Sequence, residues 1–372
     1  MDRFIPIAKP LIGDEEINLV IKVLKSGRLA QGPMVKEFEE RFAEYIGVDY
    51  AIAVSNGTCA LDLMLKAYGV KAGDEVITTP FTFIASANAI LYQGAKPVFV
   101  DIDLETYNID PDKVLEAITP KTRAILAVHL YGHPAEMQAL KEIAEDHKLL
   151  LLEDAAQAHG AEYKGSKIGS LGDAAAFSFY PTKNITTGEG GMITTNDRSI
   201  AEKLRILRDQ GQKGKYNHVM LGYNYRMTEI QAAIGLAQLN KLEHFLEVRE
   251  RNAKYLTNGL RNVSYIIPPG KKPYIRHAWH QYVIRVNDNS PIQRDKLIEL
   301  LKEKGIQTAV HYPRPIHHQP LYRGLGYPHD LCPNSIKASQ SVLSLPVHPA
   351  LTMEDLEHIV ESVIEIFKKA ES

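Results

Sequence analysis

The sequence has few cysteines and no long hydrophobic run. Its 372 residues include two cysteines, Cys59 and Cys332, and a single tryptophan. Two cysteines cannot form the disulfide framework of a small secreted domain, nor do they suggest a metal site, so we expect no metal. Every apolar run is shorter than the roughly 20 residues that cross a bilayer. Disulfide-rich and membrane-spanning proteins are therefore not indicated.

The sequence also lacks an excess of either charge. It has 43 Lys and Arg against 45 Asp and Glu, for a net charge of −2. Nucleic acids and anionic membranes bind basic surfaces, so neither is an expected partner. The first residues lack the apolar segment of a secretory signal. Together with 45% hydrophobic residues, these features predict a globular, cytoplasmic protein.

The length and the order of the predicted elements indicate two domains. In the first half, strand-like and helix-like segments alternate, which predicts a mostly parallel sheet with helices on both faces. Later segments follow another pattern, with strands at 280–286 and 308–312. We therefore expect a large domain at residues 1–248, including an N-terminal arm, and a small α+β domain at 249–372.

One lysine, Lys183, lies between two predicted core strands, at residues 174–179 and 192–195. The loop around it is rich in threonine and glycine. A buried lysine is costly as a cation, so it persists if it is exposed, paired, or used as a neutral amine nucleophile. The loop alone favours a solvated lysine.

A second signal lies about thirty residues upstream. Four leucines at 149–152 predict a strand buried on both faces, and Glu153 and Asp154 follow at once. Ligands of open α/β sheets bind at this carboxyl edge. An acid and a lysine there suit pyridoxal phosphate (PLP): the lysine holds its aldehyde as a Schiff base, and the acid keeps its pyridine nitrogen protonated. Asp154 also suits a helix N-cap, so both interpretations stay open.

A phosphate site is suggested by Ser55-Asn-Gly-Thr58, which joins a predicted strand to a predicted helix. The first amides of a helix and its dipole attract phosphate. The P-loop pattern GxxxxGK[ST] is absent, and a turn of this composition is often only a turn.

With these stretches in view, the chain resembles the DegT/StrS group of PLP-dependent sugar aminotransferases. The resemblance covers essentially the whole chain and implies fold type I, an α/β fold whose large domain has a mostly parallel sheet wrapped by helices, followed by a smaller α+β C-terminal domain. The motifs are specific in combination. They are Ser26-Gly27 with Gly32, Ser55-Asn-Gly-Thr58, Pro80-Phe-Thr-Phe83, Glu153-Asp-Ala-Ala-Gln157, Phe177-Ser-Phe with Lys183, Gly188-Glu-Gly-Gly191 and Gly222-Tyr-Asn-Tyr-Arg226.

The resemblance assigns roles around the cofactor ring. It makes Lys183 the Schiff-base lysine and the acid–base catalyst. Asp154 would pair with the pyridine nitrogen and Gln157 would bond the ring hydroxyl. Phe83 would stack on the ring face.

The resemblance also assigns the phosphate contacts. They are the backbone of Gly57 and Thr58 and the hydroxyl of Ser178. Asn224 would reach the phosphate bound to the neighbouring subunit, which implies a homodimer with shared active sites.

Six further side chains are candidate substrate contacts. The arginines suit carboxylate or phosphate groups. For His311, Tyr312 and His317, a solvated loop braced by prolines is an equal interpretation. His159 lies near the substrate or caps the end of its strand. The six are Arg28, His159, Arg226, His311, Tyr312 and His317.

The implied reaction moves an amino group, with glutamate as the expected donor, to a keto group of a nucleotide-linked sugar, for cell-surface polysaccharide or related amino-sugar biosynthesis. Pyridoxamine phosphate would be the intermediate form of the cofactor. A subgroup with histidine in place of the lysine removes a hydroxyl instead, and Lys183 speaks against that activity. Two alternatives stay open: a PLP-binding regulatory sensor, and another PLP reaction such as elimination. Neither the sugar nor the carbon that is aminated can be predicted.

Overall fold

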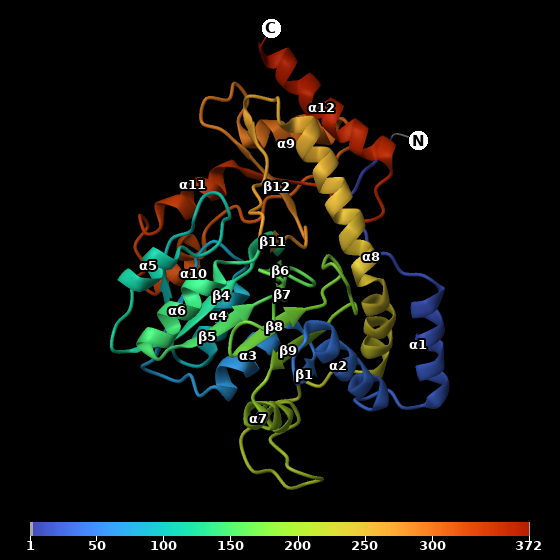
Figure 1. Ribbon diagram of the computed structural model, residues 1–372, viewed down its shortest axis with the longest axis vertical. Coiled ribbons are helices and arrows are strands. Elements are labelled where there is room, and N and C mark those ends of the chain that lie inside the picture. The colour runs from blue at the N-terminus through green and yellow to red at the C-terminus, as the bar shows by residue number, and fades with distance from the viewer. Residues whose placement is uncertain (1–2, 372) are drawn as a thin grey trace.

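The computed structural model describes residues 3–371. Its centre is a seven-stranded sheet with the order β1-β9-β8-β5-β4-β2-β3 (Figure 1). The strands from β8 to β3 pair in parallel, whereas β9 is antiparallel to both of its neighbours. The predicted mostly parallel sheet is confirmed. The strands are β1 Tyr50–Val54, β2 Glu75–Thr78, β3 Lys96–Phe99, β4 Thr122–Val128, β5 Leu150–Asp154, β8 Ala174–Ser178 and β9 Gly191–Thr195.

Helices cover both faces of this sheet, because successive side chains of a strand point to opposite faces. In β1, Ala51 and Ala53 join one hydrophobic core, while Ile52 and Val54 join the other. The first core is closed by α2 (Pro33–Ile46), α6 (Met137–His147) and the first half of α8 (Glu229–Leu260), and the second by α3 (Gly57–Ala67), α4 (Ala85–Tyr92) and α7 (Arg198–Arg208).

A further core surrounds the small antiparallel sheet β10-β12-β13. The second half of α8 enters it, so one long helix joins the two parts of the molecule (Figure 1). Ile5 of the N-terminal arm packs there too. The other elements are α1 Asp14–Ser26, α5 Pro111–Glu116, the 3-10 turns Leu130–Gly132 and Ile316–His318, β6 Glu162–Tyr163, β7 Ser166–Lys167, β10 Ile266–Ile267, β11 Ile275–Arg276, β12 Tyr282–Val286, α9 Arg294–Glu303, α10 Pro320–Gly324, α11 Pro333–Ser341, β13 Val342–Leu345 and α12 Met353–Glu371.

The strand predicted at residues 308–312 is wrong. Ala309 forms one isolated bridge with Ser344, and Pro313, which has no amide hydrogen, follows soon after. The neighbour of β12 is instead β13, which was not predicted. The predicted domain division after residue 248 falls inside α8 and stays a proposal.

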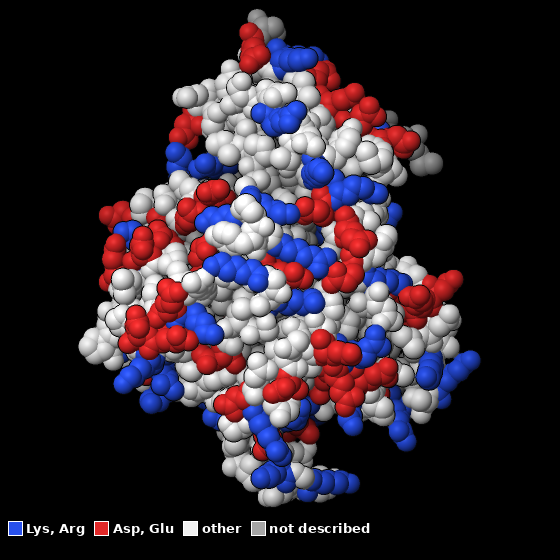
Figure 2. All heavy atoms as spheres, viewed as in Figure 1, with Lys and Arg blue, Asp and Glu red and all other residues white. Residues whose placement is uncertain are grey.

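Acidic and basic side chains are interspersed over the face seen in Figure 2. Within residues 3–371, no helix combines the length and the apolarity that a membrane crossing requires.

Candidate active site

Lys183 lies in the turn after β8, at the edge of the sheet where β5 also ends. Its amide donates to the carbonyl of Tyr180 (2.9 Å), but within residues 3–371 its amine has no hydrogen-bond or ion-pair partner. Burial lowers the pKa of Lys183 to about 8, and the negative charge of Asp154 partly opposes this shift. At that pKa a substantial fraction of the amine is neutral near pH 8, and a neutral amine acts as a nucleophile and a base.

Asp154, the last residue of β5, is only 5% exposed. Its Oδ2 accepts a hydrogen bond from the Ser86 hydroxyl (2.7 Å), and its Oδ1 accepts one from the amide of Ala156 (3.2 Å). Burial raises the pKa of Asp154, while these bonds and the charge of Lys183 act against the rise. Residues 155–160 form turns, so the helix N-cap interpretation is wrong.

The neighbouring Glu153 points to the other face and has all its acceptor capacity engaged. Its Oε2 accepts from His129 Nε2 and the amide of Gly169 (both 3.0 Å), and its Oε1 accepts from the amides of Leu171 (3.0 Å) and Gly172 (2.7 Å). Burial alone would raise the pKa of Glu153, but these donors outweigh it and lower the pKa. Glu153 therefore anchors a loop, and Asp154 is the carboxylate available to a ligand.

Gln157 ties the two parts of the molecule together at this edge. Its Oε1 accepts from the amide of Tyr131 (2.7 Å), and its Nε2 donates to the hydroxyl of Tyr312 (3.1 Å). The ring of Phe83 lies 6.1 Å from that of Tyr312 and is 56% exposed. A large exposed aromatic ring beside buried polar groups is suited to stacking on a planar ligand.

Three imidazoles that feel the charge of Lys183 are held neutral, two of them buried and that of His311 half-buried. Burial, followed by the charge of Lys183, lowers the pKa of His159 to about 3 and that of His311 to about 4, and it lowers the pKa of His280 well below its usual value. His311 Nδ1 lies 2.8 Å from the hydroxyl of Ser344. Neutral rings add no positive charge to a site that already contains Lys183.

The N-terminus of α3 meets the end of β8 closely. A Cβ atom on Gly57 would lie 2.6 Å from the Cβ of Ser178, so only glycine allows this approach. The side chain of Asn56 caps the amide of Cys59 (2.9 Å). The first amides of α3, from Gly57 and Thr58, have no acceptor within the helix, and beside the Ser178 hydroxyl they form a cradle for an anion.

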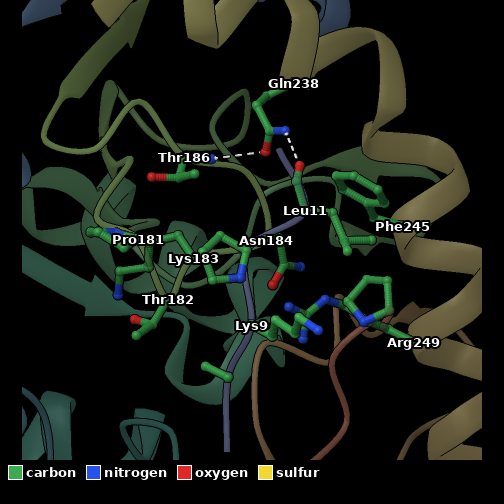
Figure 3. Close-up of a pocket in the computed structure, with 13 residues that line it drawn as sticks. Lys9, Leu11, Pro181, Thr182, Lys183, Asn184, Thr186, Gln238, Phe245 and Arg249 are labelled. Atoms are coloured by element: carbon green, nitrogen blue, oxygen red, sulfur yellow. Dashed lines mark hydrogen bonds between the residues drawn. The ribbon is translucent and has the colours of Figure 1, made fainter. Parts of the chain in front are cut away.

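A pocket opens on one side of the Lys183 turn (Figure 3). Lys9, Asn184 and Arg249 approach one another there. Arg249 Nη1 donates to the carbonyl of Trp279 (2.9 Å), and burial lowers the pKa of Arg249 to about 10. Arg249 could not be singled out from the sequence, because it lies within a long helix whose other charged residues are mostly solvated.

The remaining candidates lie outside the Lys183 turn, and Arg226 forms an isolated bridge with Val54 at the end of β1. The imidazole of His317 packs against His318, with ring centroids 4.4 Å apart. Arg226 pairs with Asp209 rather than standing free. Arg28 is exposed in the turn between α1 and α2, and Asn224 lies on a segment that bridges to Asp209. No contact joins these residues to Lys183 in the described part of the protomer.

Comparison with known sequences identifies the family. A sequence model of the DegT/DnrJ/EryC1/StrS aminotransferase family matches residues 10–364. GDP-perosamine synthase of Caulobacter vibrioides is 42% identical over 97% of this chain and 98% of its own length. The pleiotropic regulatory protein of Geobacillus stearothermophilus is 44% identical over 95% of each chain.

Comparison with solved structures leads to the same family. DesV of S. venezuelae, in complex with a ketimine intermediate, superposes with a TM-score of 0.93 at 39% identity and covers 99% of this chain and 100% of DesV. The PLP-form of Spr1654 from Streptococcus pneumoniae, described as a sugar aminotransferase, superposes with a TM-score of 0.94 at 31% identity, covering 99% of this chain and 100% of Spr1654. The fold and the resemblance inferred from the motifs are confirmed. The chain belongs to the DegT/DnrJ/EryC1/StrS aminotransferase family.

Proposed function

We propose that the protein is a PLP-dependent aminotransferase that moves an amino group from glutamate to a keto group of a nucleotide-linked sugar. The family and the GDP- and dTDP-sugar enzymes among its relatives support this activity. One observation carries the proposal: an amine with a pKa of about 8 lies at the same sheet edge as a buried carboxylate whose charge acts on it. Amino-sugar synthesis for polysaccharides and a location in the cytoplasm are parts of the same proposal.

The residues present fit PLP. The amine of Lys183 suits its aldehyde and the carboxylate of Asp154 suits its pyridine nitrogen. Phe83 offers an exposed ring face. The cradle at Gly57 and Ser178, which a Cβ would fill, suits the phosphate.

The side chains divide the chemistry between them. When bound, PLP supplies an aldehyde that accepts an amino group and a ring that takes up electrons. The neutral Nζ of Lys183 moves a proton from the donor's α-carbon to the cofactor in the first half-reaction, and from the cofactor to the acceptor's carbon in the second. The carboxylate of Asp154 holds a proton on the pyridine nitrogen. Gln157 retains a second Nε2 proton beyond its bond to Tyr312, and this proton is suited to the ring hydroxyl.

The candidate substrate contacts keep their roles as proposals. His311 and Tyr312 lie at the site and suit the sugar. His159 is buried and suits a supporting role under the cofactor. For four candidates, a role in the active site would require a second subunit. They are Arg28, Arg226, His317 and Asn224.

A homodimer with shared sites is part of the proposal. The loop at residues 209–222, which projects from the lower end of the molecule in Figure 1, exposes Tyr216 (81%) and Leu221 (80%). Large apolar side chains exposed together are typical of association surfaces. Asn224 follows directly on this loop, where a second subunit would bring it to the neighbouring phosphate.

A regulatory function is the second candidate, because one relative is named as a pleiotropic regulatory protein. Lys183 and Asp154 retain the arrangement that catalysis requires, which favours the enzyme. Neither candidate needs DNA binding, and the face seen in Figure 2 mixes acidic and basic side chains.

The test is the glutamate half-reaction. The purified protein, loaded with PLP and given glutamate without an acceptor, should release about one 2-oxoglutarate per active site. Addition of a nucleotide-linked keto-sugar should then allow repeated turnover. K183A is the control and should release none. Wild-type protein that binds PLP on Lys183 but releases no 2-oxoglutarate would contradict glutamate as the donor, and failure with a panel of amino donors would contradict the aminotransferase.

A further inference from the structure

The carboxylate of Asp154 is held from outside its own strand by helix α4. Ser86, in the first turn of α4, is 1% exposed, and its Oγ lies 2.7 Å from Asp154 Oδ2. Behind it, Thr82 is 4% exposed, and its Oγ1 lies 3.1 Å from Ser86 Oγ. The three side chains form a buried line from the loop before α4 to the end of β5.

The direction of the hydrogen bonds follows from proton counting. An ionised carboxylate only accepts, and a serine hydroxyl has one proton. Ser86 must therefore donate to Asp154, which leaves its lone pairs for the proton of Thr82. The line is a relay of hydrogen bonds from Thr82 to Ser86 to Asp154, and its bond to Asp154 is strongest while Asp154 is ionised.

The relay offsets the energetic cost of burying the negative charge of Asp154. Burial raises the pKa of Asp154, and the bond from Ser86 is the largest of the contributions that oppose this rise. The other direct donor, the amide of Ala156, is longer at 3.2 Å. The carboxylate of Glu153, in contrast, is stabilised by four hydrogen-bond donors of its own.

We propose that Ser86, oriented by Thr82, is a positioning residue that keeps Asp154 ionised and fixed so that it can hold a proton on the cofactor's pyridine nitrogen. This inference rests on the proposed function. Ser86 touches neither the substrate nor the reacting atoms in this account, so its effect passes through Asp154.

The test follows the ring-nitrogen proton in the holoenzyme. With ¹⁵N at the pyridine position, NMR reports its protonation directly as the pH is raised. S86A should bind that proton about 10- to 100-fold more weakly than wild type, the range expected for losing a hydrogen bond to a charged group. T82V, which keeps the shape of threonine, should shift the titration in the same direction by less. S86T, which keeps the hydroxyl, should titrate close to wild type.

Ser335 provides a matched control. Its buried hydroxyl donates to Asp101 Oδ1 (2.8 Å) at the start of α11, so S335A removes the same kind of bond elsewhere. S335A should leave the ring nitrogen unchanged. If S86A does not fold, the T82V titration decides the proposal on its own.

Two outcomes would overturn the positioning role. One is an S86A or T82V titration identical to wild type. The other is an S86T titration identical to that of S86A, which would assign the effect to packing and not to the hydroxyl. A wild-type protein with no PLP on Lys183 would instead overturn the proposed function itself, so the two failures are distinguishable.

Discussion

At the scale of single residues, two adjacent acids of the site differ in their hydrogen bonds and therefore in their roles. Glu153 and Asp154 are adjacent acids, yet four donors saturate one and leave the other able to bind a ligand. The sequence located both acids and Lys183, because a leucine-rich strand and a loop between two strands mark the edge of the sheet. It could not tell which acid faces the site, because that depends on strand pleat and on distant donors.

The pKa of Lys183 gives a prediction for the cofactor-free protein. Only the neutral amine condenses with an aldehyde, so the rate of PLP capture should rise with pH and reach its midpoint at about 8. The charge of Asp154 raises the pKa of Lys183, so D154N should move the midpoint to lower pH. Stopped-flow absorbance across a pH series measures both. A midpoint near the ordinary lysine value, or an upward shift in D154N, would contradict the electrostatic account.

The environment of Glu153 gives a second prediction. In E153Q an amide NH₂ replaces one carboxylate oxygen, and this NH₂ cannot accept the hydrogen bonds that the oxygen accepted. It would face two backbone amides at one position, or His129 and one backbone amide at the other. We expect a loss of about 3 kcal/mol in unfolding free energy, measured by denaturant titration.

Glu162 is the matched control, because its ion pair with Arg276 is partly exposed. E162Q should change the free energy by less than about 1 kcal/mol. Equal effects of E153Q and E162Q would show that Glu153 does not anchor its loop.

At the scale of elements, a close approach of α3 to β8 shapes the site. The alternating pattern predicted both elements and their order. The contact itself was not predictable, because a glycine in a strand–helix turn has the same sequence signal whether or not another backbone lies beside it. The strand predicted at 308–312 failed for a related reason: its β-branched and aromatic residues suit a strand, but only Ala309 reaches a partner.

The approach of α3 to β8 predicts the effect of G57A. The added methyl would lie 2.6 Å from Ser178 Cβ and would push the first amides of α3 away from β8. We expect PLP affinity to fall at least about tenfold, because the helix terminus supplies the phosphate contacts. Gly324 has open space around it, so G324A should leave affinity unchanged. Equilibrium dialysis measures both, and wild-type affinity in G57A would refute the cradle.

At the scale of the whole molecule, α8 joins the large sheet to the C-terminal core, and residues 311–312 bring that second part back to the active site. The family motifs predicted this architecture. They could not predict how one subunit meets another, because residues that act across an interface leave no contact within a single chain. We propose that Arg28 and Asn224 are such residues.

A mixing experiment tests the shared site. K183A and N224A should each be inactive, and after dissociation and reassociation together they should regain about one quarter of wild-type activity, since half of the dimers would then contain one intact site of two. K183A mixed with D154N should regain none, because both residues belong to one protomer's site. Absence of recovery in the first mixture would place Asn224 outside the partner's site.

The central claim is that Lys183 carries the cofactor, and borohydride reduction followed by peptide mapping tests it most directly. We expect one phosphopyridoxyl-modified peptide, containing Lys183, whose yield falls when glutamate is added before reduction. K183A should give no such label. A label on another lysine, or no label in protein saturated with PLP, would contradict the assignment of Lys183 and the mechanism that depends on it.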